Sequence, residues 1–410
     1  MITQDIIEKL PKTDLHVHLD GSLRLNTLIE LARETGVHLP SYSAGGLMEL
    51  VFKEKYQDLG EYLEGFHYAV AVLQTEAALE RVSYELAQDN QQEGVRYVEV
   101  RFAPQLHVHS RLSMENVLKS VNRGLERAKD EFNRRPEVVK GQEPPFEYAI
   151  VVCALRYFTE GASDYYDKVL HVHRFSPPER VFALASLELA QAAVRIRREF
   201  GIPITGFDLA GYEAGYPAGN HVEAYEYAHK NFMKKTVHAG EAYGPESIFQ
   251  AITDLHADRI GHGTFLLDTS MIADPTIEDK ERYVNELAQY IADRRITLEI
   301  CLTSNMQTNP HIKRLQDHSF VKLQAARCST TFCTDNRTVS NTTVSKEIRL
   351  AMSSLGLTPR DLKRSLIYGF KRSFFPGTYL EKRHYVRRII DYYETLEKQH
   401  PVLSDLPPAD

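Results

Sequence analysis

The sequence predicts an α/β fold, a (β/α)8 TIM barrel with a helical insertion after its first strand and extra helices at its C-terminal end. Short runs with strand character alternate with longer segments of helical period, as expected of strand–helix units around a parallel sheet. Eight such short runs occur, which is the number that closes a barrel of this type. They are Thr13–His18, Val95–Phe102, Tyr148–Ala154, Ile204–Leu209, Lys235–Ala239, Arg259–His262, Thr297–Ile300 and Ser329–Thr334.

The segments between these strands differ in length and character. Residues 39–92 follow the first strand and contain several helical pieces, so we expect a helical insertion that overhangs the pocket, as a packed layer, a substrate gate or both. Residues 133–145 contain Gly and several Pro and predict an exposed loop. The longer helices are expected at Met114–Phe132, Pro178–Phe200, Asn220–Met233 and Glu281–Arg294.

Three further helical patterns follow Thr343 and end in Tyr379–His400. The last pattern repeats apolar residues at helical spacing, which predicts a stripe that packs on the core. Its members are Leu380, Tyr385, Ile389, Ile390, Tyr393 and Leu396. Because the chain has no internal repeat or low-complexity tract, we expect one barrel domain over residues 1–410, with 39–92 and 343–410 as its additions.

Composition and charge narrow the classes of function. With 43% hydrophobic and 26% charged residues the chain is expected to fold as a globular protein. A formal net charge of -7 provides no general field for a phosphate backbone, so a nucleic-acid partner is not expected. The first residues lack a basic flank before an apolar run, and no segment is long enough to cross a bilayer, so we expect no membrane partner and a cytoplasmic location.

Four cysteines lie in or beside apolar runs and form no Cys-x-x-Cys pair, which predicts buried, reduced thiols. They are Cys153, Cys301, Cys328 and Cys333.

Polar side chains gather at the predicted carboxyl ends of the strands, where barrels of this type place their active sites. His16 and His18 lie two residues apart on the first strand, so both rings point to the same side. His238, His262 and Asp335 follow later strands. Neutral imidazoles with one carboxylate and an open position suit Zn2+, which lowers the pKa of a bound water to about 7. Glu241, three residues after His238, and His262 could then orient that water and protonate the substrate.

The tetrapeptide Leu-His-Val-His occurs three times, and only the first copy fits this site. His107 and His109 follow Pro104, which has already ended a strand, so we expect them on a loop at the surface. His171 and His173 are expected in a polar surface connection between the third strand and the next helix.

An ordered set of motifs resembles the adenosine deaminase family, metal-dependent purine aminohydrolases of the amidohydrolase superfamily. Order and spacing agree over nearly the whole chain, and the six motifs together are specific although each alone would be weak. They are Thr-Asp-Leu-His-Val-His-Leu-Asp-Gly-Ser at 13–22, Phe-Asp-Leu-Ala-Gly at 207–211, His-Ala-Gly-Glu at 238–241, Arg-Ile-Gly-His-Gly at 259–263, Leu-Thr-Ser-Asn at 302–305 and Thr-Asp-Asn at 334–336.

The resemblance implies a role for each matching position. The ligands of one Zn2+ would be His16, His18, His238 and Asp335. The catalytic groups would be Glu241, which protonates purine N1, His262, which orients or deprotonates the water, and Asp335. Substrate contacts would come from Asp20 at the ribose 5'-hydroxyl, the backbone N–H of Gly211 at purine N3, Asn336 at purine N7, and His18.

One position departs from the pattern of the animal enzymes, which carry a second aspartate where this chain has Asn336. An asparagine NH2 can still donate to a ring nitrogen. The resemblance implies hydrolytic deamination of a 6-aminopurine nucleoside, adenosine or 2'-deoxyadenosine to the inosine product and ammonia. Aminofutalosine, adenine or an N6-modified adenosine as substrate, a non-catalytic nucleoside-binding barrel, and a two-metal phosphoester or amide hydrolase stay as alternatives, and the sequence indicates no oligomeric state.

Overall fold

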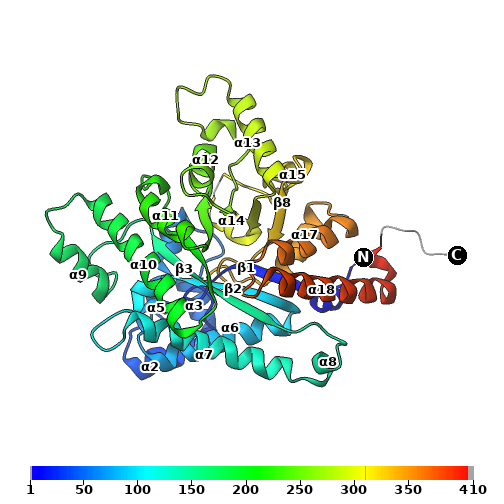
Figure 1. Cartoon of the computed structure of the whole chain (residues 1–410), viewed down its shortest axis with the longest axis horizontal. Helices are drawn as coiled ribbons and strands as arrows, with labels where there is room; N and C mark the ends of the chain where they lie inside the picture. Colours follow the sequence, from blue (N-terminus) through cyan, green and yellow to red (C-terminus); the bar gives the residue numbers. More distant parts are fainter. Residues whose placement is uncertain (1, 310, 405–410) are drawn as a thin grey trace.

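Eight parallel strands form the centre of the protein. The computed structural model describes residues 2–309 and 311–404, and its sheet has the order β1-β2-β3-β4-β5-β6-β7-β8. Helices surround these strands (Figure 1), so the predicted (β/α)8 barrel is confirmed. The strands are β1 Lys12–His18, β2 Val95–Phe102, β3 Glu147–Leu155, β4 Ile204–Ala210, β5 Lys234–Ala239, β6 Arg259–His262, β7 Thr297–Ile300 and β8 Ser329–Phe332.

The barrel closes at the seam between its first and last strands. Val17 bridges Asp335 in parallel, just beyond the end of β8. The backbone N–H of His18 donates to the carbonyl of Asp335 at 2.7 Å, and the N–H of Asp335 donates to the carbonyl of His16 at 2.7 Å. The seam therefore joins residues that the sequence places at the same site.

The helices before β3 are α1 Gln4–Lys9, α2 Leu25–Thr35, α3 Ala44–Leu50, α4 Leu59–Glu64, α5 Phe66–Val72, α6 Glu76–Gln92, the 3-10 turn η1 Pro104–His107, α7 Met114–Asn133 and α8 Pro136–Val139. From β3 to β8 they are α9 Asp164–Val172, α10 Pro178–Phe200, η2 Ala218–His221, α11 Val222–Lys230, α12 Pro245–Thr253, η3 Thr269–Met271, α13 Lys280–Arg294, α14 Leu302–Thr308, η4 Leu315–Asp317 and α15 Phe320–Ala325. The chain continues through α16 Val344–Ser354, α17 Pro359–Arg372, α18 Tyr379–Gln399 and η5 Pro401–Leu403.

The predicted helical insertion contains four helices with two different positions. Helix α6 packs against α7 and β2 and belongs to the outer layer of the barrel. Helices α4 and α5 contribute Leu59, Tyr62, Leu63 and Phe66 to the lining of the cavity at the barrel mouth. Part of this segment therefore lines the cavity, whereas the overhang of the whole segment and its movement as a gate stay predictions.

Some local predictions were wrong. The loop at residues 133–145 contains the short helix α8, in which Pro136 occupies the first turn, where its missing N–H costs nothing. The start of the predicted helix Asn220–Met233 is a 3-10 turn instead. Leu380 is 59% exposed because it lies in the first turn of α18 and misses the packed face.

The rest of the C-terminal stripe packs as predicted. Tyr385, Ile389, Tyr393 and Leu396 are buried, and Ile390 packs at the edge of the core. A capping box between Thr378 and Glu381 begins α18. The four cysteines are buried and free, as predicted.

Within the residues that the structure describes, no helix combines the length and the apolar character that a bilayer crossing needs.

Candidate active site

Strand β1 delivers two histidine rings to the mouth of the barrel. His16 is fully buried and His18 is 9% exposed, and their ring centroids lie 5.4 Å apart. The parallel pairing with β2 is irregular between Asp14 and Val17. The rings point into the barrel because alternate strand residues face the same side.

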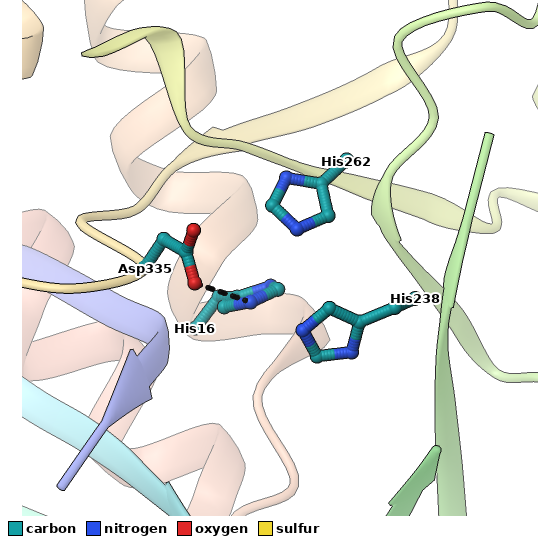
Figure 2. A group of neighbouring side chains, drawn as sticks. All are labelled: His16, His238, His262 and Asp335. Atoms are coloured by element: carbon teal, nitrogen blue, oxygen red, sulfur yellow. Dashed lines mark ion pairs between the residues drawn. The ribbon is translucent and has the colours of Figure 1, made fainter. Parts of the chain in front are cut away.

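Three later strand ends supply the neighbours of these rings. His238 lies in β5, His262 ends β6, and Asp335 follows β8. One ligand atom from each of these residues and from His16 lies within 4.8 Å of the others (Figure 2). His262 and Asp335 have φ values of 64° and 60°, the left-handed region in which a non-glycine residue costs about 1–3 kcal/mol.

His18 joins the same cluster. Its Nε2 lies 3.1 Å from Nε2 of His238 and 3.5 Å from Oδ1 of Asp335. Oδ1 of Asp335 also lies 3.3 Å from Nε2 of His16. The structure thus brings all four predicted ligands together and adds His262 beside them.

Two buried carboxylates that the sequence reasoning missed orient the rings of His16 and His238. Nδ1 of His238 donates to Asp208 Oδ2 at 3.1 Å, and Nδ1 of His16 donates to Glu299 Oε2 at 2.9 Å. Arg101 donates to both carboxylates, at 2.9 Å in each case. With Nδ1–H on a carboxylate, each neutral ring presents a bare Nε2, the form that binds a metal ion. An acidic residue inside an otherwise uncharged, buried strand was the available signal.

Burial favours the neutral form of two of the three rings. Burial lowers the pKa of His18 and of His238 below the ordinary value of 6.5. For His16, burial and Arg101 lower the pKa, but hydrogen bonds to Asp335 and Glu299 raise it further and leave it above 6.5. The pKa of Asp335 is held well below its usual range because its histidine neighbours outweigh burial. The donor set is therefore mostly neutral nitrogen plus one carboxylate, which suits a divalent metal ion.

Glu241 and His262 face each other at the rim of the cluster. Oε1 of Glu241 lies 3.5 Å from Nε2 of His262. Burial, followed by the charge of Asp335, raises the pKa of Glu241 well above 4.5, whereas burial lowers the pKa of His262 well below 6.5. Glu241 is thus suited to hold a proton at neutral pH, and His262 is neutral.

A third carboxylate that the sequence reasoning missed, Glu213, holds the turn that carries Glu241. Its buried carboxylate accepts four backbone N–H groups in succession and the hydroxyl of Ser247 at 2.5 Å. The four N–H donors are Gly240 at 2.9 Å, Glu241 at 3.0 Å, Ala242 at 2.7 Å and Tyr243 at 3.0 Å. Gly240 has φ 67°, and a Cβ there would lie 2.5 Å from Ile248, so glycine is required.

The cluster forms the floor of a cavity of about 290 Å³. Asp20, Gly211 and Asn336, the predicted substrate contacts, all line it together with apolar and aromatic side chains from α4 and α5. Burial raises the pKa of Asp20 to about 7. Asn336 donates to the hydroxyl of Tyr62 at 2.7 Å, and its Oδ1 packs where a Cβ of Gly21 would stand.

The second copy of Leu-His-Val-His is buried, so its expected surface position was wrong for His107. His107 ends η1 and is 0% exposed, and burial lowers its pKa to about 4. His109 is half-buried and contacts the carbonyl of Gln74 at 3.1 Å. In the third copy His171 is exposed as predicted, although it belongs to helix α9 and not to a polar connection.

A (β/α)8 barrel with histidine and carboxylate side chains gathered at its carboxyl mouth defines the class of the barrel amidohydrolases. The adenosine deaminase family profile matches residues 11–392, and the chain belongs to this family. An adenosine deaminase of Mycobacterium marinum is 35% identical over 376 residues, which cover 91% of this chain and 93% of that protein.

Solved structures agree on the fold. The crystal structure of an Arabidopsis N6-mAMP deaminase has a TM-score of 0.71 and 26% identity, and the match covers 94% of this chain and 99% of that one. A Burkholderia ambifaria amidohydrolase with bound Zn has a TM-score of 0.75 and 19% identity, over 97% and 95% of the two chains.

Proposed function

We propose that the protein deaminates adenosine and 2'-deoxyadenosine hydrolytically and depends on one Zn2+ held by His16, His18, His238 and Asp335. One observation carries the proposal: a mostly neutral histidine cluster lies beside Glu241. Glu241 is a buried acid whose raised pKa lets it keep a proton. The similarity to adenosine deaminases over more than nine-tenths of the chain supports the substrate.

The donor set fits zinc because two rings are oriented by buried carboxylates and converge on Asp335. When bound there, zinc supplies a Lewis acid and an activated water at neutral pH. Zn is also bound in the related Burkholderia ambifaria barrel.

The protein side chains then supply the proton and the orientation. Glu241 donates its proton to purine N1 while the oxygen of a water that has lost one proton adds to C6, and His262 lies beside the oxygen that gains charge. The proton of the added hydroxyl then passes to the 6-amino group, the C6–N bond breaks as the C6 carbonyl forms, ammonia leaves, and the proton first lost from water returns to Glu241. The N–H of Gly211, a residue with φ 97°, meets N3 without a side chain in the way. Asn336 has a second N–H for N7, because only one is used on Tyr62.

The sugar side of the cavity favours an uncharged ribose. Asp20 can accept a hydrogen bond from the 5'-hydroxyl, whereas a phosphate would add negative charge beside a carboxyl group that burial already makes costly to ionise. A nucleoside is therefore preferred to a monophosphate such as the substrate for which the Arabidopsis relative is named. A small-molecule partner, a single domain and a cytoplasmic location complete the proposal.

Turnover by the purified protein tests this function. We expect loss of the 6-amino chromophore with adenosine, little turnover of AMP or N6-methyl-AMP, and about one zinc per chain. Turnover of adenine, aminofutalosine or an N6-modified adenosine without turnover of adenosine would replace the substrate, and two metal ions would reopen the phosphoester or amide hydrolase class.

The variant Glu241→Gln tests the acid. It should keep zinc but lose about 10²- to 10⁴-fold in kcat, because an amide cannot deliver the proton. A variant as fast as the parent would remove Glu241 from the mechanism, and a parent that binds nucleosides without turnover would favour a binding protein.

A further inference from the structure

A buried chain of hydrogen bonds runs behind His262, on the side away from the cavity. Nδ1 of His262 lies 3.0 Å from Nδ2 of Asn305, in helix α14. Oδ1 of Asn305 lies 3.2 Å from Nε2 of His318, and Nδ1 of His318 lies 3.0 Å from the backbone nitrogen of Phe320. All three side chains are buried, with exposures of 1%, 0% and 2%.

The backbone N–H of Phe320 fixes the direction of every bond in this chain. A backbone N–H can only donate, so Nδ1 of His318 must accept and cannot carry a hydrogen. The proton of His318 is therefore on Nε2 and is donated to Asn305 Oδ1. The amide of Asn305 is thereby oriented with its NH2 toward His262, and Nδ1 of His262 must accept.

We propose that His318 and Asn305 are positioning residues that fix the tautomer of His262, so that Nε2 presents an N–H and not a lone pair to the cavity. This inference rests on the proposed deaminase function for its catalytic meaning, but not for its geometry. The reverse amide orientation would require a His318 ring without a hydrogen on either nitrogen, which is not a form available in water.

The neutral state of both rings makes the tautomer decisive. Burial lowers the pKa of His318 to about 4, and His262 carries no hydrogen on Nδ1 because that nitrogen accepts from Asn305. A neutral imidazole has one N–H, and the relay assigns it to the nitrogen that lies 3.5 Å from Glu241 Oε1. That nitrogen makes no hydrogen bond among the described residues, so it is free to act on a ligand.

The position of His262 alone allows two roles, a hydrogen-bond donor to the charged oxygen or a base that takes a proton from water. The tautomer decides between them. With hydrogen on Nε2, His262 can donate to the oxygen that gains charge at C6, but it cannot accept a proton from water there. It also cannot ligate a metal ion through Nε2, although its ring lies within the cluster. His262 therefore acts as a hydrogen-bond donor to the transition state.

Nitrogen NMR of the zinc-loaded protein tests the tautomer directly. With ¹⁵N-labelled histidine, and His262→Gln to assign the signals, we expect His262 to have a protonated Nε2 and an unprotonated Nδ1. The opposite pattern would overturn the inference. This readout does not depend on turnover.

Two substitutions at His318, with side chains of equal size, test whether the relay sets the tautomer of His262 and thereby kcat. His318→Gln can accept from Phe320 and donate to Asn305, so the tautomer and kcat should stay within about threefold of the parent. His318→Glu, when ionised, only accepts, so Asn305 should turn and move the proton of His262 to Nδ1. We then expect kcat to fall about a hundredfold, the effect of losing one oxyanion donor, with KM and zinc content nearly unchanged.

The matched control is His221→Gln, another buried histidine, whose ring contacts Ser186 at 2.8 Å outside the cavity lining. Its kcat should stay within about twofold, apart from any loss of stability. In every variant the tautomer and kcat should change together. A reversed tautomer with full kcat, or an unchanged tautomer with a hundredfold loss in a zinc-loaded folded variant, would overturn the inference.

Failure of the proposed function would look different. A parent protein that turns over no aminopurine would contradict the deaminase assignment, while the NMR signals would still confirm or overturn the relay.

Discussion

The same four residues, Leu-His-Val-His, occupy two regions of the molecule with opposite electrostatic character. In β1 the rings of His16 and His18 meet Asp335 and buried carboxylates. In η1 His107 is equally buried, but the described residues give it no ion pair, and its pKa falls to about 4. The comparison teaches that the side chains arriving from other strands, not the local sequence, make a histidine a candidate ligand.

The largest expected effect comes from His16→Ala. Loss of this ring removes one proposed nitrogen ligand and one of the hydrogen-bond partners of Glu299, so we expect zinc content to fall below about 0.1 per chain and kcat by at least about a thousandfold. Metal analysis and turnover measure both. Full activity in a zinc-loaded His16→Ala protein would contradict the distinction between His16 as a proposed ligand and His107 as a buried ring.

The carboxylate beneath the ring should matter less than the ring itself. Glu299→Gln keeps the shape but weakens the orientation of His16 and the pair with Arg101, and second-layer changes of this kind cost about 10- to 100-fold in metal affinity. Competition with a chelator measures the affinity. An affinity equal to that of the parent would show that the buried carboxylate only stabilises the fold.

The pH dependence of kcat should follow the titration of Glu241 and His262 at the barrel mouth, and not that of His107 in η1. Glu241 must be protonated to act, and its pKa is raised by burial, so kcat should fall as pH rises through that raised pKa. His262 must be neutral, and its pKa is lowered, so the acid limb should lie below pH 6.5. The basic limb should disappear in Glu241→Gln, and a basic limb unchanged in that variant would assign it to another group.

The smallest expected effect on activity comes from His107→Ala, the matched change in the second copy. We expect zinc content and kcat within about twofold, and a loss of about 1–3 kcal/mol in stability because a buried ring leaves a cavity. Thermal unfolding and turnover separate the two. A loss of zinc comparable to that in His16→Ala would remove the distinction between the copies.

Much of the fold could be predicted from local pattern. Strands such as Val95–Phe102 and Arg259–His262 were predicted with their observed bounds, because short runs with strand character between segments of helical period are typical of strand–helix units. The polar residues of the site could also be found, since they follow strand ends that a barrel brings to one mouth.

The partners of these residues could not be predicted. Asp208 and Glu299 lie on different strands from the rings they orient, and their pairing depends on the register of the closed barrel. The bond from Asn336 to Tyr62 depends on how α4 settles over the mouth. His107 was misplaced because burial in a turn leaves no periodic signal in the sequence.

The seam between β1 and β8 has a consequence for how the protein is made. His16 and His18 leave the ribosome early, whereas Asp335 emerges only after seven other strands have been synthesised. A nascent chain therefore holds only part of the proposed ligand set until its last strand docks and the backbone bonds of the seam form. Tight metal binding at this position would then require the complete chain, and would distinguish fully folded barrels from partly folded ones.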